Sequence, residues 1–333
     1  MPAVNHVFTV FSLLAFTSPS VPFTWHLTEA SSWNAGTCLF IFWTGLSSLV
    51  WFINSIVWDG NIVNWTPVWC DISTRIAIAT TIGIPASMLV IQRRTYFMVR
   101  QSATNEKTAQ KRRALAIDLL IGLGLPILNM ILSIIVQGHR FDILEDVGCY
   151  PAIVNTSLTY ILITLWPVFI GIASFVFTVM NLSYIQRHRH SLDSWMECTP
   201  SSLLTSSLYI RLVVLGFIAF GLSSMLSVRD LVSQITSGSV VWPGWNVVHA
   251  DFGRVDQIPR GIWAGRGAHS GFGVELKRWV SVGCALAAFF VLGTTREAGE
   301  RYRAFGRMIL KVLGGKNGQQ DEENGDLKRY AFG

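Results

Sequence analysis

The feature that most constrains this chain is a series of seven apolar segments, each about long enough to cross a bilayer as a helix of roughly 20 residues. A helix satisfies its own backbone hydrogen bonds, as the bilayer interior requires. We therefore predict an all-α integral membrane protein whose residues 1–295 form one seven-helix transmembrane bundle. The predicted spans lie near residues 4–23, 35–58, 68–91, 114–136, 157–181, 208–228 and 279–295.

Two of these spans are less clear than the others. The first is interrupted by Pro19 and Pro22, and the last is the shortest. Pro85, Pro126 and Pro167 lie inside later spans, where we expect kinks in a packed bundle rather than functional hinges.

The composition supports a membrane protein and excludes other classes. Of the 333 residues, 14% are charged, against about 25% in a typical soluble domain. The net charge of +6 does not indicate a nucleic-acid partner, because Lys and Arg lie between the apolar segments. The spans hold no His pair, Cys/His dyad or paired carboxylates, so we expect no enzyme, metal or cofactor. His139 and His249 in the outer loops should make polar contacts.

Positive charge is concentrated on one side of the predicted bundle. Residues 92–113 carry seven basic residues against Glu106 alone, and eight more follow Thr295. Because basic segments normally stay in the cytoplasm, we predict an extracellular N-terminus and a cytoplasmic C-terminus. Residues 229–278 break this pattern with six basic residues against four acidic ones, although the rule weakens in long loops.

The segment after the last span predicts an amphipathic cytoplasmic helix and then a disordered tail. Apolar residues recur at helical spacing from Tyr302 to Leu313, with Arg303 and Arg307 on other faces. This pattern is typical of a helix at the membrane interface, which we place at residues 296–313. Residues 314–333 are rich in Gly, Gln, Glu and Asn, so we expect disorder there.

Two of the five cysteines face the predicted outer side. Cys70 begins the third span and Cys149 lies in the loop after the fourth, whereas Cys38 and Cys284 lie within spans. Disulfides persist in oxidising compartments, so we predict a Cys70–Cys149 bridge that holds an acidic loop over the mouth of the bundle. Two unpaired thiols are the alternative.

Charged residues inside spans are candidates for function by default. Asp71 and Arg75 are four residues apart, which would place them on one helical face as an ion pair. The pair is either structural or a contact for the polar end of a ligand. For Asp118 and Arg211, near the cytoplasmic ends, we favour structural pairing or snorkelling.

Several strings spread over nearly the whole chain carry a family resemblance. The most specific is VQGHRFDILEDVGC at residues 136–149. Others are PFTWH at 22–26, NAGT at 34–37, PVWCDI at 67–72, GIPAS at 83–87, KRR at 111–113, WP at 166–167 and FF at 289–290. Together they resemble the fungal lipopeptide pheromone receptors of the a-factor receptor family, class D G-protein-coupled receptors, in the basidiomycete B-mating-type branch.

The resemblance implies a plasma-membrane receptor for a short peptide with a farnesylated C-terminal cysteine. It also implies activation of a heterotrimeric G protein, through its α subunit, that feeds a MAP-kinase mating pathway. A prenyl chain gains about 0.8 kcal/mol per buried CH₂, so it would seek an apolar groove while the peptide meets the polar outer loops. Membrane lipids are expected partners, and a homodimer stays open.

Two docking surfaces are predicted. The ligand contacts are Trp69, Asp71, Arg75, His139, Arg140, Asp142, Glu145, Asp146, Tyr150, Trp245, His249 and Phe252. The G-protein contacts are Arg93, Arg94, Lys111, Arg112, Arg113, Arg187, Arg189 and Arg211.

The chain departs from the family pattern at two places. Residues 210–227 of the sixth span contain no proline, which puts a proline-hinged motion in doubt, and the tail lacks a long Ser/Thr-rich extension. Two alternatives stay open: a transporter or channel, although no internal repeat is visible, and a receptor-like protein with another ligand or constitutive activity.

Overall fold

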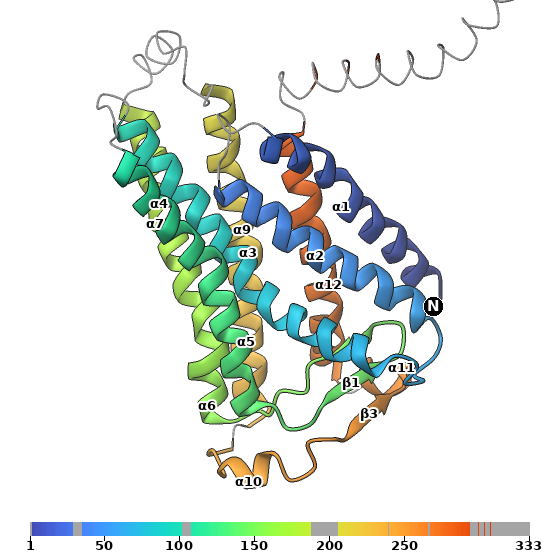
Figure 1. Ribbon diagram of the computed structural model, residues 1–333. Helices are drawn as coiled ribbons and strands as arrows, with labels where there is room; N and C mark the ends of the chain where they lie inside the picture. Colours follow the sequence, from blue (N-terminus) through green and yellow to red (C-terminus); the bar gives the residue numbers. More distant parts are fainter. Residues whose placement is uncertain are drawn as a thin grey trace, which may run out of the picture.

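Long helices lying side by side make up most of the chain (Figure 1) in the computed structural model. The structure describes residues 2–28, 35–101, 108–187, 206–238, 240–265 and 267–293, with Gly299, Arg303 and Arg307. The rest of the predicted amphipathic helix at 296–313 and the tail at 314–333 lie outside these residues, so both stay predictions.

The helices follow the predicted spans in order. They are α1 (Pro2–Thr28), α2 (Ala35–Val57), α3 (Pro67–Gln101), α4 (Thr108–Leu119), α5 (Leu125–Val136), α6 (Ser157–Thr159), α7 (Leu165–Arg187), α9 (Ser206–Thr236) and α12 (Gly267–Leu292). Five described stretches are long and apolar enough to cross a membrane, namely residues 35–57, 67–98, 109–136, 157–187 and 209–236. These correspond to the predicted second to sixth spans, whereas α1 and α12 are not among the five.

Several helices extend well past the predicted bounds. The third predicted span ended at residue 91 and the sixth at 228, but α3 continues to Gln101 and α9 to Thr236. Hydropathy marks only the part of a helix that lies in the hydrocarbon core. Backbone hydrogen bonding continues beyond it into the interfacial region.

Two of the helical stretches contain a π-helical turn next to a proline. The turn η1 (Leu120–Gly124) precedes Pro126, and η2 (Tyr160–Thr164) precedes Pro167. Proline has no amide hydrogen and its ring clashes with the carbonyl four residues back, so a wider turn at that carbonyl relieves the conflict. Helix α3, by contrast, continues through Pro85.

The bundle exposes many large apolar side chains and buries several polar ones within a largely apolar interior. Leu120, Ile161 and Phe169 are 67%, 61% and 64% exposed, while Gln92 and Asn181 are fully buried. Apolar side chains on the outer face of a span are expected to meet lipid. The interior is filled mainly from α2, α3, α9 and α12, by residues that include Phe40, Trp43, Met88, Ile91, Leu215 and Cys284.

A three-stranded sheet lies at one end of the bundle, which corrects the all-α prediction (Figure 1). Strand β1 (Phe141–Leu144) pairs antiparallel with β2 (Gly148–Tyr150) and parallel with β3 (Val255–Ile258). The short helices α10 (Trp245–Val248) and α11 (Arg260–Trp263) flank β3 in sequence. We call residues 137–156 and 240–263 the lid, and the end of the bundle that carries them the lid end.

Candidate functional site

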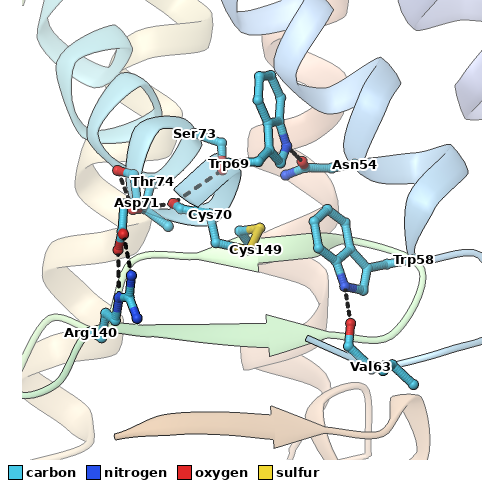
Figure 2. The surroundings of a disulfide bond; sticks show 10 residues. All are labelled: Asn54, Trp58, Val63, Trp69, Cys70, Asp71, Ser73, Thr74, Arg140 and Cys149. Carbon is cyan, nitrogen blue, oxygen red and sulfur yellow. Dashed lines mark hydrogen bonds and ion pairs between the residues drawn. A yellow bond between two sulfur atoms is a disulfide. The ribbon is translucent and has the colours of Figure 1, made fainter. Parts of the chain in front are cut away.

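A disulfide fixes the lid to the bundle, as predicted (Figure 2). Cys70, in the first turn of α3, is bonded to Cys149 in β2, and both residues are buried. Trp58, Phe141 and Ile143 pack in the same buried cluster. The bridge spans 79 residues of sequence, and closing a loop of that size removes about 4 kcal/mol of entropic stabilisation from the unfolded chain.

The turn between β1 and β2 needs glycine at position 148. Gly148 has a φ of 84°, a left-handed conformation that side chains disfavour. A Cβ at this position would also lie 2.7 Å from Cε3 of Trp58. The turn can therefore sit directly against the end of α2.

Glu145 and Asp146 in this turn connect the two halves of the lid. One Asp146 carboxylate oxygen accepts a bond from the Gly60 amide at 2.9 Å, and the other accepts from Nη1 of Arg260 at 2.5 Å. Glu145 accepts from the Arg260 amide at 2.7 Å, and its carbonyl accepts from the Trp263 indole at 3.2 Å. These predicted ligand contacts thus hold the lid together.

Asp71 pairs with Arg140 of the lid. The predicted ion pair of Asp71 with Arg75, on the same helix, is therefore wrong. Arg140 donates from Nε and Nη2 to the two Asp71 oxygens at 2.9 and 2.6 Å (Figure 2). This bidentate geometry raises the pKa of Arg140 and is stronger than a single contact along one helix. Arg75 instead donates to Ser133 at 3.1 Å and to Gln137 at 2.5 Å, so it joins α3 to the end of α5.

A second charged group lies where β1 meets β3. Nε2 of His139 lies 2.6 Å from Oδ1 of Asp142 and 3.6 Å from Oδ2 of Asp256. Arg254 donates from Nε to Asp256 at 2.9 Å. Burial raises the pKa of Asp142, and the hydrogen bond with His139 partly opposes this.

The remaining predicted ligand contacts divide into separate groups, one on α3 and one in the lid. Trp69 donates to Oδ1 of Asn54 at 2.8 Å (Figure 2). Trp245 stacks on His249 with ring centroids 3.9 Å apart, and the ring centroids of His249 and Phe252 are 5.4 Å apart. Nε2 of His249 lies 2.9 Å from the carbonyl oxygen of Ile134, so this aromatic group rests on the end of α5.

Two charged residues at the lid end were missed by the sequence analysis. Lys277 of α12 lies 2.8 Å from Asp230 of α9 and donates to the Tyr150 hydroxyl at 3.5 Å. Arg278 is buried and donates to Oδ1 of Asn5 at 3.0 Å and to the Asp146 carbonyl at 3.1 Å. A sequence signal for these residues existed. Lys277 and Arg278 lie just before the predicted seventh span, and Asp230 lies just after the sixth.

At the opposite end, the predicted G-protein contacts also divide into two sets. Arg93 and Arg94 both bond the buried carboxylate of Asp118, the former at 2.5 Å. This agrees with the structural interpretation of Asp118. The basic residues that are exposed on α4 and α7 are Lys111, Arg112, Arg113 and Arg187. Arg211 is partly buried on α9, and Arg189 lies outside the described residues.

A buried amide network joins α3, α7 and α9 near this end. Gln92 donates to the Leu212 carbonyl at 2.8 Å, and Asn181 donates to Oε1 of Gln92 at 3.1 Å. The Tyr209 hydroxyl donates to Oδ1 of Asn181 at 3.3 Å. Gln92 and Asn181 are polar residues at the ends of predicted spans, a signal that the sequence analysis did not use.

Comparison with known proteins identifies the family. The family described as "Pheromone A receptor" matches residues 7–312, which include the whole lid and the helices below it. The chain belongs to this family. The match confirms the resemblance seen in the sequence strings, and it places the chain among receptors rather than enzymes. Because the chain belongs to a receptor family and has several helices apolar and long enough to cross a bilayer, it is a membrane protein.

Curated relatives agree with this assignment. The chain is 39% identical over 309 residues to the pheromone B alpha 2 receptor of Schizophyllum commune, covering 92% of this chain and 47% of the relative. It is 30% identical over 260 residues to pheromone receptor 1 of Mycosarcoma maydis, covering 78% and 72%. To the pheromone a factor receptor of Saccharomyces cerevisiae it is 23% identical over 226 residues, covering 67% and 47%. The chain spans about half the length of the Schizophyllum relatives.

Proposed function

We propose that this chain is a G-protein-coupled receptor for a farnesylated peptide mating pheromone. The observation that carries the proposal is the family match over residues 7–312, in a chain whose lid is tethered by the Cys70–Cys149 disulfide. The bound peptide activates a heterotrimeric G protein through its α subunit, and this signal feeds a MAP-kinase mating pathway.

The proposed topology has seven spans in the plasma membrane, with α1 first and α12 last. The lid faces the outside, because its disulfide needs an oxidising compartment. The exposed cluster Lys111–Arg113 belongs to the opposite end of the bundle and faces the cytoplasm, as the charge rule for short loops requires. The N-terminus, on the same end as the lid, is then extracellular.

The ligand site that we propose centres on the Asp71–Arg140 pair, with Trp69, Arg75, His139, Asp142 and Tyr150 around it. Asp71 and Arg140 are 42% and 37% exposed at their side chains, so a peptide can reach both charges. Trp245, His249 and Phe252 provide a second, aromatic contact. Glu145 and Asp146 contribute by keeping the lid in position.

On the cytoplasmic side we propose that the G-protein α subunit contacts Lys111, Arg112, Arg113, Arg187 and Arg189 directly. The first four are exposed, and clustered positive charge favours rapid encounter with an acidic partner surface. Arg93 and Arg94 act through their shared partner Asp118, which positions α4 against α3. Arg211, which is partly buried on α9, is the remaining proposed contact.

The test is nucleotide exchange on the G-protein α subunit by the purified chain in lipid vesicles. A panel of peptides from compatible mating types is supplied with and without the farnesyl group. Exchange should rise with a farnesylated peptide and stay near the basal rate with its unmodified copy. If no farnesylated peptide stimulates exchange while the disulfide is intact, the proposed function is wrong.

A further inference from the structure

The cluster of His139, Asp142 and Asp256 has the composition and convergence of a metal site. We propose that these three residues bind a divalent transition metal ion, with Zn²⁺ as the first candidate, where β1 meets β3. The sequence analysis expected only polar contacts from His139. The strand pairing adds Asp256, which no spacing in the sequence places beside His139.

The geometry fits a small ion after a slight adjustment. One ligand atom from each residue lies within 4.8 Å of the others. Zinc bonds to nitrogen and oxygen are about 2.0–2.2 Å long in tetrahedral sites, which separates the ligand atoms by roughly 3.3–3.6 Å. The contact of His139 with Asp256 is already 3.6 Å, and the one with Asp142 is 2.6 Å and must open. A fourth position is left for water.

The charge balance of the strand pair favours a cation. Asp142 and Asp256 are direct partners in the parallel register of β1 and β3, and like charges opposite each other destabilise a sheet. Asp142 is also partly buried, so little water is available to screen the repulsion. A divalent ion between the carboxylates would remove this repulsion and join the two strands.

Arg254 would compete with the ion for Asp256 and His139. It bonds Asp256 at 2.9 Å, and its Nη2 lies 3.3 Å from Nδ1 of His139. When Nε2 of His139 binds a metal, the ring proton moves to Nδ1 and faces this guanidinium. Arg254 must then turn away, which its half-exposed side chain allows. Removing Arg254 should therefore tighten metal binding.

The ion would connect two loops that leave different helices. Strand β1 follows α5, whereas β3 lies between α9 and α12, so the metal would restrain the second loop against the first. The site itself does not depend on the proposed pheromone. Its test therefore measures metal binding directly.

The experiment titrates the purified full chain in detergent with Zn²⁺ by calorimetry, and follows Co²⁺ by its visible absorption. His139→Ala and Asp256→Asn should each weaken Zn²⁺ binding by about 10–100-fold or more. A loss of that size already follows when a residue that only hydrogen-bonds a metal ligand is replaced. Arg254→Ala should strengthen it. His6→Gln removes an imidazole outside the lid and should leave the Zn²⁺ affinity unchanged.

Thermal unfolding in chelator separates a lost ligand from a misfolded lid. Asp256→Asn keeps the size of the side chain and removes the repulsion with Asp142, so without metal it should unfold at or above the wild-type temperature, and it should lose the stabilisation that Zn²⁺ gives the wild type. Wild-type chain that shows no saturable Zn²⁺ binding, or an Asp256→Asn variant that binds equally tightly, would overturn the proposal.

Discussion

The substitution Gly216→Ala should separate α9 from α3 at the end opposite the lid. A Cβ at position 216 would lie 2.7 Å from Cδ of Gln92 and 3.1 Å from Oγ1 of Thr178. Gln92 is fully buried, and its amide bonds both the Leu212 carbonyl and Asn181. An added methyl group must therefore displace either this amide or the helix.

The cost follows from the bonds that the displacement breaks. A net intramolecular hydrogen bond is worth about 0.5–1.5 kcal/mol, and a buried polar group left unpaired costs about 1–3 kcal/mol. Losing the Gln92 contacts should thus cost roughly 2–3 kcal/mol. At about 1.4 kcal/mol per factor of ten, the arrangement with separated helices becomes roughly 30- to 150-fold more populated.

Gly221→Ala provides the matched control on the same helix. No described heavy atom lies within 4 Å of a Cβ at this position. Both substitutions gain the same helix propensity of about 1 kcal/mol over glycine, so their difference isolates the contact with Gln92. The assays are thermal unfolding in detergent and basal nucleotide exchange without ligand.

Gly216→Ala should unfold at a lower temperature than Gly221→Ala and show higher basal exchange. The unfolding measurement does not depend on the proposed G-protein coupling. Equal unfolding temperatures for the two variants would refute the packing argument, whatever the exchange rates show.

Four further outcomes are expected. Cys149→Ser should lower the free energy of unfolding by about 4 kcal/mol, and reductant should then have no additional effect on its unfolding temperature. Asp71→Ala and Arg140→Ala should show a coupling energy of about 0.2–1 kcal/mol in a double-mutant cycle, because the pair is partly exposed; a coupling of zero would contradict the bidentate contact. Arg278→Leu should destabilise the chain by about 1–3 kcal/mol, measured by thermal unfolding, since it leaves Oδ1 of buried Asn5 and the Asp146 carbonyl without their donor. Replacing Lys111–Arg113 by glutamine should weaken nucleotide exchange while pheromone affinity stays unchanged, and an equal loss of both would indicate misfolding instead.

Features that depend on local sequence were predictable. The second to sixth spans follow from runs of apolar residues, and the family follows from strings such as that at residues 136–149. The disulfide followed from topology, because Cys70 and Cys149 were assigned to the same side of the bundle. The spans and the disulfide need only the chain's periodicity and the chemistry of the bilayer, whereas the family needs the resemblance of its sequence strings to known receptors.

Features that depend on distant partners were not predictable. Strand β3 is four residues long and pairs in parallel with β1, more than 100 residues earlier in the chain, so no local alternation indicates it. The spacing of Asp71 and Arg75 permitted an ion pair, but Arg140 approaches from the lid and offers two donors. Gln92 likewise finds its partners only when α7 and α9 pack beside α3.

The parallel pairing of β1 with β3 has a consequence for exchanging specificity between receptors. Residues 141–144 pair one to one with residues 255–258, so the two loops form a single structural unit. A chimera that inherits only one loop from a relative would place a foreign strand against the native register. Under the proposed function, both loops should therefore be exchanged together when ligand preference is transferred, so that this matched pair of strands stays intact.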